Sequence, residues 1–382
     1  MNCVVQDSTE VQFSHVPTHV GDVLQPFRSK HHTHSLSSIT ATATADRLSR
    51  VDNTSKGIKS VYRSNLMSEL TSNVLLDTAF EHICKTRLHA HHNDDIWSLR
   101  QQWERRKTAL REGLLDGSYH LSPLTVIKVR NGSYVSRWNA EDSVVLKAIS
   151  MVIGSIVNSE TDGTCYHLAG RGGLKAAVRH VQQQVSLGSY KYIIKSDIAK
   201  YYASMNHKQV MTQVKACGIE DRRILRLIQE YMERVEVLDG EYHHVTCGIA
   251  KGCPLSPLIG GLYLKSLDEL HGAGIFYARY MDDWVWMVRT RKMCRKLVRQ
   301  MHEVVKSLGM KLAWDKTYIG RIRNGFSFLG YAFKPNEPLQ ASNIAKERHA
   351  NRIAELYEQG ASKQRIRQYI NNWKKWVKAG VE

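Results

Sequence analysis

The chain has 382 residues, 42% of them hydrophobic, with 54 Lys and Arg against 36 Asp and Glu and a formal net charge of +18. This length allows a large core and two or three subdomains. No apolar run approaches the roughly 20 residues that span a bilayer, and the N-terminus MNCVVQDSTE lacks a signal peptide's apolar stretch. We therefore expect a cytoplasmic protein without membrane contact.

The excess of cationic side chains predicts a polyanionic partner, whose binding would weaken with salt through counterion release. A membrane surface is the alternative polyanion, but it requires a basic amphipathic helix with a bulky apolar face near a terminus. The N-terminus offers none, so nucleic acid is favoured. The seven cysteines are scattered without a C-x-x-C pair, which argues against a disulfide framework and a zinc knuckle.

The N-terminal half reads as mostly helical with one hairpin. Residues 1–65 are rich in Ser, Thr, His and Asn, and we assign this extension no function. Apolar periodicity predicts helices across 66–115. Two strand-like runs, 124–130 and 133–138, are joined by Asn-Gly at 131–132, the strongest short-range signal for a hairpin with a type I′ turn.

The rest of the chain mixes helices with further strands. Helical stretches are expected at about 141–157, 171–187, 205–216, 220–237 and 293–308. The strand YKYIIKSD ends at Asp197, and a second hairpin runs through 275–289. The last 42 residues read as helices with nine Lys or Arg against four acids.

The adjacent acids Asp282 and Asp283 fall at the tip of the second hairpin, because both flanks are rich in aromatic and β-branched residues. Their ordinary interpretation is structural, since Asp favours turns and caps nearby amides. Asp197 changes the balance, because a carboxylate leaving a buried strand beside this tip brings like charges together, which is costly unless cations bridge them. Carboxylate oxygens suit Mg²⁺, and two such ions stabilise the attacking and leaving oxygens of phosphoryl transfer. The pattern favours nucleotide polymerisation.

Six segments resemble those of reverse transcriptases. YARYMDDWVWM resembles the Y-x-D-D catalytic hairpin, and IIKSDIAKYYASMNH resembles the first catalytic strand. GIAKGCPLSP (248–257) resembles the template and dNTP loop, and SLGMKLAWDKTYIG resembles the element with the family's lysine. FSFLGYAF (326–333) resembles the primer grip, and YHLAGRGG (166–173) resembles a segment near the fingers. The resemblance covers about 120–382 and is to bacterial enzymes of the group II intron lineage.

This resemblance implies an α+β right-hand polymerase with fingers, a palm built from an antiparallel sheet with helices, and a helical thumb. It assigns N-terminal helices and fingers to 66–195, the palm with the catalytic motifs to 196–335, and a basic thumb to 336–382, with fingers and palm interleaved. The implied activity is RNA-directed DNA synthesis from dNTPs on an RNA template, giving cDNA. The implied cofactor is a pair of Mg²⁺ ions, for which Mn²⁺ could substitute.

Carried over by motif, the resemblance makes Asp197, Asp282 and Asp283 metal ligands and adds the carbonyl of Ile198 as a further ligand. Lys316 would protonate or neutralise the departing pyrophosphate as a catalytic group. For Lys316, the alternative is an ordinary surface lysine on a basic protein.

Tyr202 lies five residues after Asp197, where the family keeps a bulky ring against the sugar and leaves no room for a 2′-hydroxyl. RNA polymerases with related palms usually place a second acid near this spot, but residues 201–203 read Tyr-Tyr-Ala. DNA synthesis is therefore favoured. An ordinary core tyrosine is the alternative.

The remaining predicted contacts are with substrate and primer. Substrate contacts are expected from Lys128, Arg137, Arg171, Lys251 and Gly252, and the primer grip from Phe328, Leu329, Gly330 and Tyr331. Two departures affect fine mechanism and not reaction class: Lys251 stands where the family has glutamine, and the segment after Arg137 lacks its R-P-L-x-I-P. Near the C-terminus, Trp373 and Trp376 fit a core seam, while the surrounding cations would follow a duplex backbone.

The sequence shows no endonuclease segment, no C-x-x-C module and no retron-type V-T-G segment. It thus resembles stand-alone bacterial reverse transcriptases of antiphage defence, which work with a structured noncoding RNA encoded beside them. The alternatives are an enzyme derived from a group II intron or another retroelement and, from a different class, a catalytically idle palm that only binds RNA. Clustered acids repel phosphate, which argues against a pure binder. The oligomeric state stays open.

Overall fold

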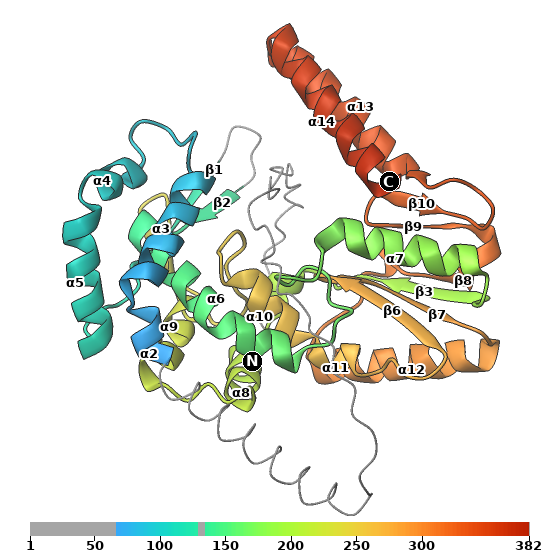
Figure 1. The fold of residues 1–382 in the computed structure, drawn as a ribbon, viewed down its shortest axis with the longest axis horizontal. Helices are drawn as coiled ribbons and strands as arrows, with labels where there is room; N and C mark the ends of the chain where they lie inside the picture. Colours follow the sequence, from blue (N-terminus) through green and yellow to red (C-terminus); the bar gives the residue numbers. More distant parts are fainter. Residues whose placement is uncertain (1–65, 129–133, 382) are drawn as a thin grey trace, which may run out of the picture.

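The computed structural model describes residues 66–128 and 134–381 (Figure 1). Helices are interspersed with three β-sheets, so the predicted α+β class is confirmed. In these two ranges, no helix is both long enough and apolar enough to cross a bilayer. The six cysteines that fall within them are free thiols.

The first helices form a bundle with the long buried helix α6 (Ala140–Glu160) at its centre. The others are α2 (Leu66–Leu70), α3 (Asn73–Thr86), α4 (Asp95–Gln101) and α5 (Trp103–Asp116). Helix α6 contacts α2, α3 and α4, because apolar residues occupy most of its circumference, as expected of a helix in the centre of a bundle. Side-chain caps fix two of the helix starts: Ser72 accepts from the Leu75 amide and Asp94 from the Ile96 amide.

Asp142 is a buried acid on α6, and it makes stability depend on pH. It accepts hydrogen bonds from Tyr119 Oη (2.5 Å) and the Ser122 amide (3.0 Å). Burial raises its pKa from 3.8 to about 6. Because the pKa is higher in the folded chain, the stabilisation is complete below pH 4 and is lost as pH rises through 6.

We expect Asp142→Asn to remove this dependence, since the amide keeps an acceptor for Tyr119 but carries no charge. Wild type should lose roughly 3 kcal/mol of unfolding free energy between pH 4 and 8 that the variant retains. Urea unfolding at several pH values measures the difference. Parallel curves for the two proteins would contradict the assignment.

One of the three sheets, ordered β2-β1-β4-β5, lies beside these helices. Its strands are β1 (Leu124–Lys128), β2 (Tyr134–Arg137), β4 (Val235–Leu238) and β5 (Glu241–His244). Strands β1 and β2 are antiparallel with Thr125 opposite Arg137, as predicted, whereas the Asn-Gly turn at 131–132 lies outside the described residues.

The prediction of a helix over 220–237 is wrong at its C-terminal end. Helix α9 (Arg222–Met232) stops at Met232, and Val235 begins β4, which pairs in parallel with β1 and antiparallel with β5. Val235 continues the apolar period of α9, so a helical pattern alone could not separate them. The signal that could have done so is Asp239-Gly240, a hairpin dipeptide whose residues both have positive φ.

The central sheet carries the predicted catalytic segments. Its order is β6-β7-β3-β8, antiparallel throughout, with β3 (Tyr192–Ser196), β6 (Ile275–Tyr280), β7 (Asp283–Val288) and β8 (Tyr318–Arg321). Helix α7 (Gly173–Leu187) covers one face, while α11 (Lys265–Asp268) and α12 (Arg291–Ser307) lie along the other (Figure 1).

Alternation along β7 explains this sandwich. Val285 and Met287 join the cluster of α7, whereas Trp284 and Trp286 join the cluster of α12. All four side chains are fully buried. The strand is therefore held from both faces, which gives its first residue, Asp283, a rigid support.

Further elements connect this sheet to the rest of the chain. Beside it lie α8 (His207–Ala216), α10 (Ser256–Tyr263) and the 3₁₀ turns Tyr201–Ser204, Trp314–Lys316 and Ile322–Asn324. A small third sheet contains β9 (Phe326–Phe328), β10 (Tyr331–Phe333) and β11 (Gln340–Ala341).

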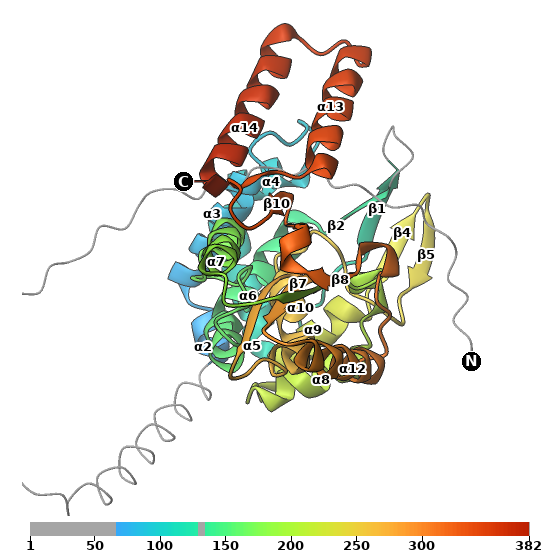
Figure 2. The same ribbon diagram turned by 90° about the vertical axis from the view of Figure 1, so that its right-hand side faces the viewer.

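Helices α13 (Asn343–Glu358) and α14 (Lys363–Val381) project from the body as a pair (Figures 1 and 2). Trp373 stacks on His349 of α13 at 4.0 Å between ring centroids, and Trp376 packs on Tyr331 at 4.6 Å. Both rings thus lie in packing seams, as predicted.

Candidate active site

The hairpin expected at 275–289, whose tip holds the predicted catalytic acids, is present as β6 and β7. Tyr280 pairs with Asp283, which leaves Met281 and Asp282 as a two-residue turn. Met281 has φ +58°, the left-handed conformation that a tight hairpin requires and that side chains with a Cβ disfavour. Asp282 is therefore presented at the tip, and Asp283 begins the returning strand.

Strand β3 brings Asp197 to the same tip. Its last residue, Ser196, is paired with Trp284, so Asp197 emerges next to Asp283. The Asp197 carbonyl accepts from the Ala313 amide (2.8 Å), and the Lys311 carbonyl accepts from the Ala199 amide (2.9 Å). Ile198 lies between these two bonds as an isolated bridge to Leu312, which leaves its own carbonyl outside them.

The three carboxylates repel one another in a buried setting. Burial and the neighbouring Asp197 raise the pKa of Asp282 from 3.8 to about 7. Burial raises the pKa of Asp283 to about 7 as well, with Lys195 opposing the effect and Asp197 and Asp282 adding to it. Charge is costly at this point of the fold unless a cation is present.

The donor set fits a hard divalent cation. Among the described residues, Asp197 Oδ1 and Asp283 Oδ1 are buried atoms without a hydrogen-bond partner, and unpaired carboxylate oxygens are ligands that Mg²⁺ prefers. Within those residues, however, no group of three or more His, Cys, Asp or Glu side chains is already gathered to hold a metal ion. Lys316 Nζ lies 3.1 Å from Asp197 Oδ2 and supplies positive charge beside the carboxylates.

Tyr202 lies against the turn. It belongs to the 3₁₀ turn Tyr201–Ser204, and its Oη donates to the Met281 sulfur (2.9 Å). A Cβ on Gly260 would come within 3.2 Å of the Tyr202 ring, so a glycine on α10 makes room for it. The ring is thus fixed between the hairpin tip and α10.

The loop at 248–257 is pinned to the segment after Asp197. The amides of Gly248 and Ile249 donate to Met205 and Tyr202 carbonyls, both at 2.8 Å. A Cβ at Gly248 would lie 2.8 Å from the Ala203 backbone, and its φ is +82°, so only glycine fits. The loop start is therefore locked next to Tyr202.

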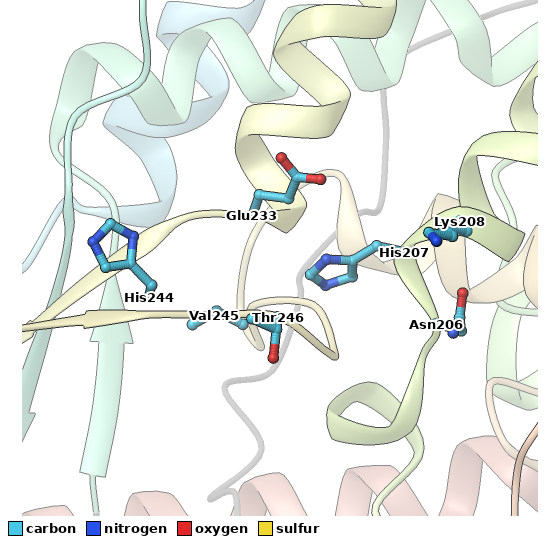
Figure 3. Close-up of a pocket in the computed structure, with 7 residues that line it drawn as sticks. All are labelled: Asn206, His207, Lys208, Glu233, His244, Val245 and Thr246. Carbon is cyan, nitrogen blue, oxygen red and sulfur yellow. The ribbon is translucent and has the colours of Figure 1, made fainter. Parts of the chain in front are cut away.

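A cavity of about 490 Å³ adjoins this loop start. It is lined by Asn206, His207, Lys208, Glu233, His244, Val245 and Thr246 (Figure 3). His207 and Arg234 both bond the Gly248 carbonyl, at 2.8 and 3.1 Å. The cavity includes none of the predicted site residues, and its walls support the loop from behind.

The predicted substrate residues lie in different settings. Lys128, Lys251 and Gly252 are exposed, and Lys128 Nζ lies 6.0 Å from the centre of the Tyr134 ring. Arg137 is paired with the buried Asp94 (2.6 Å). Arg171 turns back to the C-terminal end of α6 and donates to the carbonyls of Asn158 and Thr161, at 2.7 and 2.9 Å.

The segment Phe328–Tyr331 forms the β9–β10 turn and reaches Asp283 of the β6–β7 hairpin. Leu329 and Gly330 both have positive φ, and the Leu329 amide lowers the pKa of Asp283 against the effect of burial. Tyr331 Oη donates to the Trp376 carbonyl (2.6 Å). This turn therefore joins the carboxylates to helix α14.

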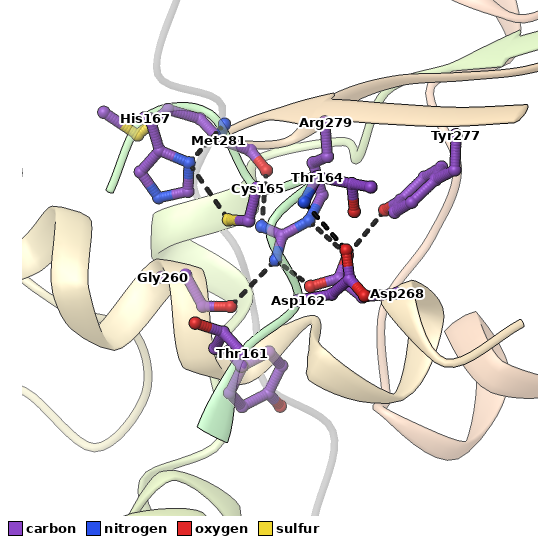
Figure 4. A network of polar contacts seen from close by, with 12 residues as sticks. Thr161, Asp162, Thr164, Cys165, His167, Gly260, Asp268, Tyr277, Arg279 and Met281 are labelled. Atoms are coloured by element: carbon purple, nitrogen blue, oxygen red, sulfur yellow. Dashed lines mark hydrogen bonds and ion pairs between the residues drawn. The ribbon is translucent and has the colours of Figure 1, made fainter. Parts of the chain in front are cut away.

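Sequence reasoning missed Arg279 and Asp268. Both side chains are fully buried: Arg279 Nε lies 2.6 Å from Asp268 Oδ1, its Nη2 pairs with Oδ2, and Tyr277 donates to the same carboxylate (2.6 Å) (Figure 4). Arg279 Nη1 also donates to the Met281 carbonyl (3.0 Å). An arginine inside an apolar strand next to the tip was the available signal, but its acid lies on α11 and only the fold pairs them.

A family model described as reverse transcriptase (RNA-dependent DNA polymerase) matches residues 143–333, half of the 382-residue chain. The chain belongs to the reverse transcriptase family and carries its RNA-directed DNA polymerase domain. The matched range contains the central sheet, the hairpin tip and the loop described above.

Individual relatives share less than a quarter of their aligned residues with this chain. Protein YkfC of Escherichia coli (strain K12) is 24% identical over 301 residues, covering 65% of this chain and 77% of YkfC. The group II intron-encoded protein LtrA of Lactococcus lactis subsp. cremoris is 19% identical over 169 residues, covering 41% of this chain and 27% of LtrA. This chain therefore matches about a quarter of LtrA. A solved apo telomerase from Candida tropicalis, truncated from its C-terminal domain, gives a TM-score of 0.46 at 13% identity and covers 58% of this chain and 54% of that one.

Proposed function

We propose that the chain copies RNA into DNA at the hairpin tip, with Asp197, Asp282, Asp283 and the Ile198 carbonyl as ligands of two Mg²⁺ ions. The observation that carries the proposal is that Asp197, from a distant strand, acts electrostatically on the adjacent Asp282 and Asp283, whose two carboxylates have raised pKa values. Asp197 and Asp283 each also have an unpartnered buried oxygen. When bound, the ions would stabilise the charge on the attacking and leaving oxygens. Mn²⁺, with similar ligand preferences, is the expected substitute.

The chain's own residues supply positioning and a proton. We assign Lys316 to the departing pyrophosphate, because its ammonium group lies at the edge of the carboxylates and is half-exposed. Tyr202 would exclude a 2′-hydroxyl by occupying the space beside the sugar. Lys128, Arg137, Arg171, Lys251 and Gly252 would contact substrate; in Arg137 only Nη1 is paired with Asp94, and its other N–H groups would serve.

The subdomains follow the same proposal. Residues 66–195 would form the N-terminal helices and fingers, 196–335 the palm and 336–382 a thumb, with fingers and palm interleaved. The turn Phe328–Tyr331 would hold the primer end, since it joins the hairpin tip to α14. Cations on α13 and α14 would follow the duplex.

Primer extension tests the activity. Wild type with a primed RNA template, dNTPs and Mg²⁺ should make cDNA, and the product should disappear with EDTA and return with Mg²⁺ or Mn²⁺. The double variant Asp282→Ala, Asp283→Ala should make none. Equal extension by both proteins would mean that the activity does not come from these carboxylates, which would refute the enzymatic proposal and favour a palm that only binds RNA.

The finer proposal is a defence role with an associated structured noncoding RNA. Its support is the family resemblance and the formal net charge of +18, which suits an extended polyanion. Sequencing the RNA that copurifies with the protein distinguishes the outcomes. A single structured RNA encoded beside the gene supports defence, whereas intron sequence supports the retroelement alternative.

A further inference from the structure

Met281, at the centre of the catalytic turn, is held from three directions by side chains outside the turn. Its amide donates to His167 Nδ1 (3.0 Å), its carbonyl accepts from Arg279 Nη1 (3.0 Å), and its sulfur accepts from Tyr202 Oη (2.9 Å). These contacts matter because Met281 adopts φ +58°, a conformation that persists only where its surroundings determine it. Asp282 follows directly, so any relaxation of Met281 moves that carboxylate.

The geometry defines the protonation of His167. A backbone amide can only donate, so Nδ1 must accept and the ring proton must lie on Nε2. Nε2 is 3.0 Å from the Pro257 carbonyl and donates to it. Burial and the charge of Arg279 lower the pKa of His167 to about 3, so the ring stays neutral with one donor and one acceptor.

Cys165 Sγ also lies 3.4 Å from His167 Nδ1, but the bonds to Met281 and Pro257 are the ones that lead to different parts of the site. Met281 is in the catalytic turn, whereas Pro257 ends the loop that resembles the family's template and dNTP loop and lies in the first turn of α10. A Cβ on Gly261 of the same helix would lie 3.2 Å from His167 Nε2, so the helix has a gap where the ring approaches. Figure 4 shows the imidazole beside Met281. Because Nε2 also reaches the Pro257 carbonyl, the ring lies between the loop and the turn.

The segment that carries His167 is itself fixed to the hairpin. The Tyr166 amide donates to the Arg279 carbonyl (2.8 Å), and the Arg279 amide donates to the Thr164 carbonyl (2.9 Å). Arg279 also donates to the Gly261 carbonyl (2.9 Å). His167 thus has a rigid base, and its two bonds have defined directions.

We propose that His167 is a positioning residue that sets the place of Asp282 through the Met281 amide and couples the substrate loop to it through the Pro257 carbonyl. This inference rests on the proposed function of the hairpin tip. It assigns separable tasks to the two ring nitrogens, the Met281 bond to the chemical step and the Pro257 bond to nucleotide binding.

A pair of amide variants separates the two bonds. In His167→Asn, the side-chain oxygen takes the position of Nδ1 and keeps an acceptor for Met281, while the reach to Pro257 is lost. In His167→Gln, the side-chain nitrogen takes the position of Nε2 and keeps a donor for Pro257, while Met281 loses its acceptor.

We expect the Asn variant to keep kcat within about threefold and to raise KM for dNTP about tenfold. The Gln variant should keep KM within about threefold and lower kcat about tenfold or more. His180→Asn is the matched control, because His180 is a half-buried histidine on α7 that bonds Tyr166 and packs on Phe276, at the end of β6 opposite the tip. Its kcat and KM should stay at wild-type values.

Hydrogen exchange tests the same claim without catalysis. In the metal-free protein, the Met281 amide should exchange at least about tenfold faster in His167→Gln and at the wild-type rate in His167→Asn. Unchanged exchange in the Gln variant would overturn the proposal, as would equal losses of kcat in both variants that follow their melting temperatures. If wild type makes no cDNA, the proposed function fails, and the exchange rates still decide the role of His167.

Discussion

Asp282→Asn is expected to lower primer extension with Mg²⁺ at least about a thousandfold and, at the same time, to raise the melting temperature of the metal-free protein. The activity is lost because one carboxylate charge of the proposed metal site is removed, and metal stabilisation of transferring phosphate is worth several kcal/mol. Asn has nearly the same shape, so packing at the tip is preserved.

The gain in stability follows from electrostatics. The pKa of Asp282 is about 7 in the folded chain against the ordinary 3.8, because the group is buried beside Asp197. Since its folded pKa is raised, its contribution to stability is full below pH 4 and is lost as pH rises through 7. At pH 8 the ionised group therefore opposes folding, and the neutral amide does not.

Thermal unfolding at pH 8 and primer extension measure the two effects. Asp239→Asn is the matched control, because Asp239 is an exposed residue in the turn between β4 and β5. Its φ is positive, a conformation that Asn adopts well. It should change neither quantity appreciably. A lower melting temperature for Asp282→Asn would indicate that the variant fails through misfolding and would remove its support for the metal site.

Tyr202→Ala is expected to shift the choice of sugar, with rNTP incorporation relative to dNTP rising about a hundredfold. The ring is fixed by its bond to Met281 and lies so close to Gly260 that a Cβ there would come within 3.2 Å of it, so it cannot turn aside for a 2′-hydroxyl. Alanine leaves an opening of the size of the missing ring.

Single-nucleotide incorporation on an RNA template, with matched dNTP and rNTP, gives the ratio of the two kcat/KM values. Tyr202→Phe is the control, because it keeps the ring and removes only the bond to Met281. It should retain the wild-type ratio within about threefold, with a lower kcat if the turn loosens. Discrimination that survives in the alanine variant would make Tyr202 an ordinary core residue.

Local patterns were sufficient to predict most of the secondary structure. The two predicted hairpins, β1 with β2 and β6 with β7, were expected from alternation and turn residues. Helix α12 was expected from its 3.6-residue period. The prediction failed where two periods overlap: Val235 fits the apolar face of α9, yet it begins β4. Pairing with β1, more than 100 residues earlier in the chain, settles that choice, and no local pattern contains it.

The sequence by itself indicated the family and singled out the three carboxylates, because the chemistry proposed at the hairpin tip requires particular residue types at adjacent positions. Only the tertiary structure decided what holds them. His167 contacts Met281 across 114 positions, and Arg279 meets Asp268 on another element, so neither contact leaves a periodic or spaced signal. Burial makes these polar contacts specific, since a buried donor or acceptor without its partner is costly, and burial arises only when the sheet, α10 and α11 have come together.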